Sequence, residues 1–93
     1  MATTTNFAVS VGTTATEIIA AKAERTSFYI ENAEAVTTIF VGGDNTITTV
    51  TGLPVQAGGI ITEDMGHRMW KGPIFGIVAT GTADVRVWDR SHR

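Results

Sequence analysis

The stretch Phe40 to Gly59, FVGGDNTITTVTGLPVQAGG, holds the features that decide how this chain folds. It contains two glycine pairs, an Asp-Asn couple and a Gly-Leu-Pro step, which are residues that tight turns require. Proline has no backbone N–H for a sheet ladder and restricts the residue before it, so Gly52-Leu53-Pro54 marks the end of an extended segment. The backbone is therefore predicted to reverse direction more than once within this stretch.

Segments of alternating apolar and polar residues precede this stretch. Phe7 to Val11 reads FAVSV, which has the period of two typical of a strand with one buried face. Thr26 to Asn32 (TSFYIEN) and Val36 to Val41 (VTTIFV) are also extended, and only a short connection separates them. The short connection predicts a hairpin, in which Phe40 lies beside Tyr29 on the outer face.

Two further extended segments follow the stretch. Pro73 to Thr80 (PIFGIVAT) is almost entirely apolar, which is typical of a strand buried on both faces. Ala83 to Asp89 (ADVRVWD) alternates, so Val85 and Val87 are predicted to face the core and Trp88 to face outward.

The whole pattern contains about seven or eight short strands, with turns roughly every 8–12 residues and no amphipathic helix of useful length. It predicts an all-β fold, a small antiparallel β-sandwich or barrel. The chain has 93 residues, which corresponds to a single domain. We expect a flexible N-terminal arm at residues 1–6, the β-sandwich domain at residues 7–89 and a tail at residues 90–93.

Composition narrows the classes of function. Charged residues make up 17% of the chain, below the roughly 25% of an average soluble domain, which suggests that a neighbour covers part of the surface. The net charge of -2 argues against a protein that binds nucleic acid through broad electrostatics. No apolar run approaches the roughly 20 residues of a membrane span, and the N-terminus lacks the features of a signal peptide. We expect synthesis in the cytoplasm, and neither a membrane nor a nucleic acid as partner.

Residues suited to catalysis or metal binding are sparse. The chain has no cysteine, its two histidines are His67 and His92, and no serine lies in a recognised strand-to-helix nucleophile turn. Glu63, Asp64 and His67 supply metal-ligand atoms but follow no known metal-site spacing. The pair Asp44-Asn45 is better explained as a turn held by side-chain hydrogen bonds. We expect no enzyme activity, no metal and no cofactor.

The two tryptophans are the residues most suggestive of a binding surface. Tryptophan in a small β-domain serves as core, as a platform for a sugar ring or as an anchor in a protein interface. Trp88 is flanked by Arg86 and Arg90 and is predicted to point outward, which favours an anchor against another chain. Trp70 lies in a loop beside Lys71, where core packing and a lectin-like role both fit.

Three segments, VGTTATEIIAAKAERTSFYIEN, IFVGGDNTITTVTGLPVQAGG and GIVATGTADVRVW, together resemble a recurring small virion protein of tailed phages. The shared pattern runs from a Val-Gly-Thr strand start through Arg-Thr-Ser and an aromatic strand to a Val-Gly-Gly turn. A Gly-Leu-Pro step, a Gly-Gly turn and a Gly-Thr-Ala-Asp-Val-Arg-Val strand complete it. The resemblance covers residues 11–88, and the loop GHRMWKG within that range departs from it.

The resemblance implies a structural component of the virion, most directly a head decoration (cement) protein on the capsid exterior. Its partners would be the major capsid protein and further copies of itself, as a homotrimer near three-fold positions. A neck, tail or head-fibre-base component is an alternative placement on the virion. A carbohydrate-binding module that uses exposed tryptophans is an alternative from another class of function.

The expected contact residues come from outward positions of the predicted strands and from the N-terminal arm. They are Trp88, Phe40, Tyr29, Arg86, Thr3, Thr4 and Thr5.

Overall fold

The structure is a computed structural model, and it describes residues 3–64 and 70–91. These residues form eight strands: β1 (Thr3–Val11), β2 (Thr16–Ile19), β3 (Arg25–Asn32), β4 (Ile39–Gly42), β5 (Leu53–Val55), β6 (Ile60–Asp64), β7 (Ile74–Ile77) and β8 (Ala83–Ser91). Within the described ranges no residue is helical. The predicted all-β fold is confirmed.

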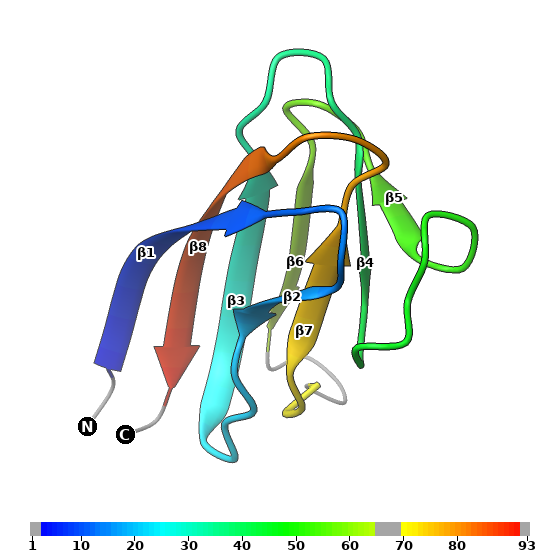
Figure 1. Cartoon of the computed structure of the whole chain (residues 1–93). Helices are drawn as coiled ribbons and strands as arrows, with labels where there is room; N and C mark the ends of the chain where they lie inside the picture. Colours follow the sequence, from blue (N-terminus) through cyan, green and yellow to red (C-terminus); the bar gives the residue numbers. More distant parts are fainter. Residues whose placement is uncertain (1–2, 65–69, 92–93) are drawn as a thin grey trace.

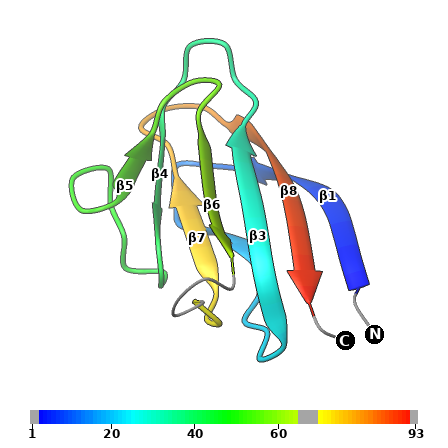
Figure 2. The ribbon, with the colours of Figure 1, turned by 180° about the vertical axis from the view of Figure 1, so that it is seen from behind.

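The strands form two four-stranded antiparallel sheets that pack against each other (Figure 1). The order is β1-β8-β3-β6 in the first sheet and β2-β7-β4-β5 in the second. Figure 2 shows the first sheet in front, with β1 and β6 as its two edges. The fold is therefore a small β-sandwich, the first of the two architectures that the alternation predicts.

The predicted hairpin between β3 and β4 is wrong, because the two strands belong to different sheets. The connection crosses from one sheet to the other, and the buried side chain of Asn32 holds it there. Asn32 Nδ2 donates to the carbonyl oxygens of Thr37 at 2.8 Å and Val55 at 2.9 Å. Phe40 accordingly pairs with residues of β5 and β7 in the second sheet and lies nowhere near Tyr29.

The core lies between the sheets and receives the inward residues of both. Val85 is fully buried, Val87 is buried and Trp88 is exposed, as the alternation of β8 predicts. Gly76 of β7 makes the close approach that its position suggests, because a Cβ there would lie 2.7 Å from Ile18 Cδ1. The buried apolar residues are Val11, Ile18, Ile19, Phe28, Ile30, Ile39, Val41, Val55, Ile74, Val78, Ala83, Val85 and Val87.

The ends of the domain differ from the expected arm and tail. Residues 3–6 are the first part of β1, and the pairing of β1 with β8 runs without interruption from Thr3 opposite Ser91 to Val11 opposite Ala83. The start of β1 pairs with the end of β8, so the sheet extends beyond residues 7 and 89, the expected limits of the domain. Residues 1–2 and 92–93 lie outside the described residues.

Candidate functional site

The outer face of the first sheet carries a row of side chains that crosses all four strands. The strand registers place Tyr29 of β3 opposite Thr62 of β6 on one side and opposite Trp88 of β8 on the other. Trp88 in turn lies opposite Asn6 of β1. Because residues opposite each other in a sheet share a face, the row is continuous from one edge to the other.

Two aromatic rings and one guanidinium group form the centre of this row. The rings of Tyr29 and Trp88 meet edge to face, with centroids 6.4 Å apart and an interplanar angle of 70°. The guanidinium carbon of Arg90 lies 5.9 Å from the Trp88 ring centroid, within the range of a cation–π contact. Trp88 is nevertheless 45% exposed. We call Tyr29, Trp88 and Arg90 the aromatic cluster.

The aromatic cluster borders a shallow hollow of about 210 Å³ on this face. The remainder of the hollow is lined by two hydroxyl-bearing residues, Ser27 and Thr62, and by Phe28. Edge-to-face pairs contribute about 0.5–1.5 kcal/mol beyond burial of their area. The contacts that restrain both rings exist before any partner arrives, so binding here would sacrifice little side-chain freedom.

A row of charged side chains lies beside the aromatic cluster on the same face. Arg86 Nη2 lies 2.8 Å from Asp84 Oδ2, and Arg86 is opposite Glu31 in the sheet. The hydrogen bond from Arg86 holds the pKa of the Asp84 carboxyl below its usual range, and the same bond raises the pKa of Arg86. Both groups are solvent-exposed, so the pair forms a polar border beside the aromatic cluster, in which Arg90 is the one charged residue.

The expected contact residues fall into separate groups in the structure. Tyr29, Trp88 and Arg86 share the outer face of the first sheet, and Thr4 joins them through its position opposite Arg90. Thr5 lies opposite the buried Asp89 and therefore belongs to the other side of β1. Of the other expected contact residues, Phe40 is in the second sheet and Thr3 is the first residue of β1. Arg90 was expected in the tail and not as a contact residue, but it lies over Trp88.

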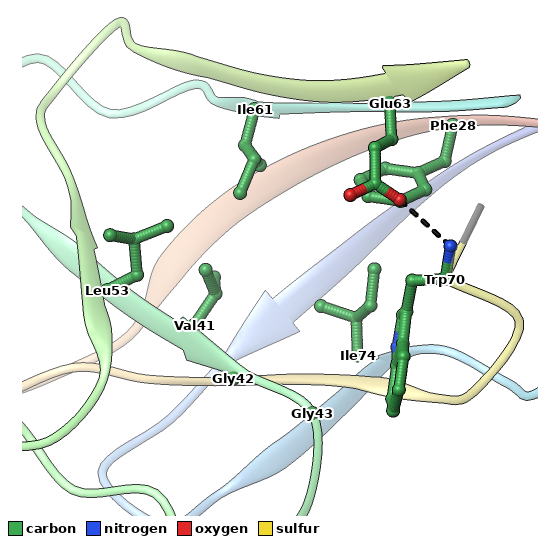
Figure 3. Close-up of a pocket in the computed structure, with 9 residues that line it drawn as sticks. All are labelled: Phe28, Val41, Gly42, Gly43, Leu53, Ile61, Glu63, Trp70 and Ile74. Carbon is green, nitrogen blue, oxygen red and sulfur yellow. Dashed lines mark hydrogen bonds between the residues drawn. The ribbon is translucent and has the colours of Figure 1, made fainter. Parts of the chain in front are cut away.

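A second concave feature lies between the sheets, a cleft of about 440 Å³ (Figure 3). Its lining is mostly apolar, with Trp70 and Glu63 at one end: Phe28, Val41, Gly42, Gly43, Leu53, Ile61, Glu63, Trp70 and Ile74. The backbone N–H of Trp70 donates to Glu63 Oε1 at 2.9 Å, and the indole Nε1 donates to the carbonyl of Pro73 at 2.9 Å.

The indole of Trp70 also packs against two glycines. A Cβ on Gly72 would clash with Trp70 Cζ2, and one on Gly43 would lie 3.1 Å from the same atom. Trp70 is 45% exposed, so it is a wall of the cleft and not a core residue, and its polar atoms already have partners. Of the two interpretations left open for Trp70, core packing is wrong and the lectin-like role stays a prediction.

A buried ion pair fixes the segment that carries Trp70. Arg25 is fully buried, and its Nε lies 3.1 Å from Asp89 Oδ1. Its Nη1 donates to the carbonyls of Trp70 at 3.1 Å and Gly72 at 2.9 Å. This pair was not predicted from the sequence, although the alternation that places Val85 and Val87 inward also places Asp89 inward, where a carboxylate requires a cation.

Glu63, Asp64 and His67, at which no metal is expected, are not tested as a set by the structure. Neither histidine belongs to the described part of the chain. Among residues 3–64 and 70–91, no three His, Asp or Glu side chains gather as metal ligands would. The same residues include no helix of the length and apolarity that crossing a membrane requires.

Comparison with known proteins adds no assignment. The chain matches no protein-family model and no curated protein.

Proposed function

We propose that this chain is a structural protein of a tailed-phage virion that decorates the capsid exterior and stabilises it by bridging copies of the major capsid protein. The observation that carries the proposal is the aromatic cluster, in which the exposed Trp88 meets the half-buried Tyr29 and Arg90 lies over the indole. Its phage context comes from the resemblance of residues 11–88 to small virion proteins.

The chemistry of the aromatic cluster suits a protein partner. Tryptophan, tyrosine and arginine are the residue types most enriched at the energetic centres of protein interfaces. Here they come from β3 and β8, the two central strands of the sheet, so the surface that presents them is rigid. The neighbouring Asp84–Arg86 pair supplies a polar rim, the arrangement that excludes water from an apolar centre.

The stabilising mechanism needs no chemical step. A decoration protein that contacts two or more capsid subunits makes their separation require the loss of several contacts at once. Linking contacts that are individually weak raises the overall affinity by orders of magnitude, roughly 10²–10⁴. A rigid β-sandwich transmits such a load well, because its backbone hydrogen bonds and close-packed core resist deformation.

The test is binding of purified chains to capsids that lack this protein, measured by co-sedimentation. Wild-type protein should saturate the capsids, while Trp88→Ala and Arg90→Ala should weaken binding by at least about tenfold, as loss of an interface anchor does. Val36→Ala is the matched control, because Val36 is 89% exposed in the connection between β3 and β4, outside this face. Equal binding by all variants would contradict the proposal.

Two alternatives give different results in related assays. If the chain is a neck, tail or head-fibre-base component, it will occur in virions in a few copies instead of in stoichiometric proportion to the capsid protein. A carbohydrate-binding module would retain glycans on an array and lose them on Trp88→Ala, since Ser27 and Thr62 put hydroxyl groups beside the exposed indole. Glycan binding without capsid binding would favour that second function.

A further inference from the structure

The four edge strands of the sandwich are not equally protected against pairing with another chain. A strand at a sheet edge presents unpaired N–H and C=O groups, and natural proteins blunt such edges with short length, charge, proline or bulges. Three of the four edges carry such a device. β5 has three residues and contains Pro54, β6 ends in Glu63-Asp64, and β2 has four residues, contains Glu17 and has a register shift at that residue.

β1 carries none of these devices. It is nine residues long, reads TTTNFAVSV, contains neither a charged residue nor a proline, and pairs with β8 without a register shift. Within the described residues its other edge faces no strand, since β1 is the outermost strand of its sheet. Phe7 and Val9 are only half-buried against the core, so apolar surface lies beside the unpaired backbone groups.

We propose that the free edge of β1 pairs antiparallel with β1 of a second copy about a two-fold axis perpendicular to the sheet. Full overlap of Thr3–Val11 with itself centres the axis on Phe7. Phe7 then faces its own counterpart on the inner side, and Asn6 faces Ala8 on the outer side. If only Thr3–Val9 overlaps, because the end of β1 curves toward β2 (Figure 1), the axis moves to Asn6, and inner residues still face inner residues.

A second copy is the occupant that this edge fits best. A two-fold axis of this kind places inner face beside inner face, so the half-buried apolar residues of one copy meet those of the other. No charged side chain lies on β1, so self-pairing brings no like charges together. The product is one eight-stranded sheet, which is within the usual size of an open sheet.

The pairing also has a consequence for the outer face. The two Trp88 side chains would be separated by three inter-strand spacings, or about 14 Å, on one continuous surface. The dimer would therefore present two aromatic clusters on one face of the joined sheet to the same partner. Self-association does not depend on the identity of that partner, so this inference stands or fails independently of the proposed function. Two-fold pairing takes the place of the homotrimer that the resemblance implies.

Sedimentation equilibrium of the purified full chain tests the inference. Wild-type protein should have the mass of two chains, and Asn6→Lys/Ala8→Lys should shift it to one chain by placing four lysines at the seam in either register. The matched control is Ile60→Lys/Thr62→Lys, which puts the same charges in the same two cross-strand rows at the opposite edge of the sheet. It should remain a dimer.

The results that overturn the inference are equally definite. A wild-type monomer, a trimer, or a dimer that survives the β1 lysines while the β6 lysines dissociate it would each exclude two-fold pairing through β1. Circular dichroism of all variants should be unchanged, because the substituted positions are exposed or carry only one hydrogen bond.

A distance measurement tests the geometry without perturbing the seam. The chain has no cysteine, so Ile60→Cys introduces a single labelling site, on β6 and exposed. Pairing through β1 separates the two β6 strands by seven inter-strand spacings. Double electron–electron resonance spectroscopy should therefore report about 35 Å between the two spin labels. A separation of about 10 Å would indicate pairing through β6 and would overturn the inference.

Discussion

Arg25 Nε lies 3.1 Å from Asp89 Oδ1, and both side chains are almost completely removed from solvent. The pair joins Arg25, the first residue of β3, to Asp89, the third residue from the end of β8. Through the hydrogen bonds of Arg25 Nη1 it also holds the segment at Trp70 and Gly72. Lys22 Nζ adds a second cation, 3.5 Å from Asp89 Oδ2. The end of the sandwich near Trp70 is thus organised by buried charge.

Removing one partner of this pair should destabilise the fold strongly. Asp89→Ala leaves the Arg25 guanidinium buried without its counter-charge, and breaking such a pair typically lowers the free energy of unfolding by about 3–5 kcal/mol. Urea denaturation measures the change. Asp84→Ala is the control, because it breaks the exposed pair with Arg86 on the same strand and should leave the midpoint nearly unchanged. Equal midpoints for the two variants would contradict a structural role for Asp89.

The buried amide of Asn32 gives a second prediction. Asn32→Asp replaces an NH₂ group that donates to the carbonyls of Thr37 and Val55 with an acceptor, so two carbonyl oxygens would face a carboxylate oxygen. We expect the free energy of unfolding to fall by about 2–3 kcal/mol at neutral pH. Asn45→Asp, an equivalent change in an exposed turn, should have little effect in the same thermal melt.

The two sides of β8 should respond differently to substitution. Val85→Asp buries an unpaired carboxylate at a position with no exposure and should prevent folding, as judged by circular dichroism. Trp88→Ala removes an outward, half-exposed ring and should leave the domain folded, because the pair contact contributes only about 0.5–1.5 kcal/mol beyond the area that the ring buries. A soluble Val85→Asp variant that melts like the wild type would refute the facing of β8.

The turn at Asp44 should titrate abnormally. The Thr46 hydroxyl and backbone N–H both donate to the Asp44 carboxylate, at 2.6 Å and 2.9 Å, and they lower its pKa. Because the folded-state pKa lies below the unfolded one, this contribution to stability is present above the unfolded pKa and is lost as the pH falls through the folded pKa. Nuclear magnetic resonance titration should show the low pKa, and Thr46→Val should raise it toward the usual range. Thr49→Val, in the same connection, should leave it unchanged.

Alternation was sufficient to predict the outward and inward sides of β8, and together with the turn spacing it predicted a small all-β fold, either a sandwich or a barrel. It could not decide which strands pair, because the short link after Asn32 is compatible both with a hairpin and with a crossing between sheets. The deciding interaction is the Asn32 amide with carbonyls 5 and 23 residues further along the chain, and sequence spacing does not reveal such contacts.

The candidate site was predictable only in part, because alternation shows which way a side chain faces but not which strands pair. Trp88 and Tyr29 could be placed outward from their own strands, but their edge-to-face contact depends on the pairing of β3 with β8. Arg90 was assigned to a tail because the length of β8 depends on β1, which supplies its partner residues as far as Ser91. Local patterns do not encode long-range strand pairing. For this reason the contact between Tyr29 and Trp88 was not predicted, and Arg90 was wrongly assigned to a tail.

The pairing of Thr3 with Ser91 brings the two ends of the described domain side by side. Cargo fused to either end would therefore leave the molecule at one corner, at the opposite end of β1 and β8 from the turns that precede β2 and β8 (Figure 1). A linker of a few residues would suffice to close the chain into a ring. New ends could then be opened in the exposed connection at residues 44–51, which would give a circular permutant with all eight strands intact.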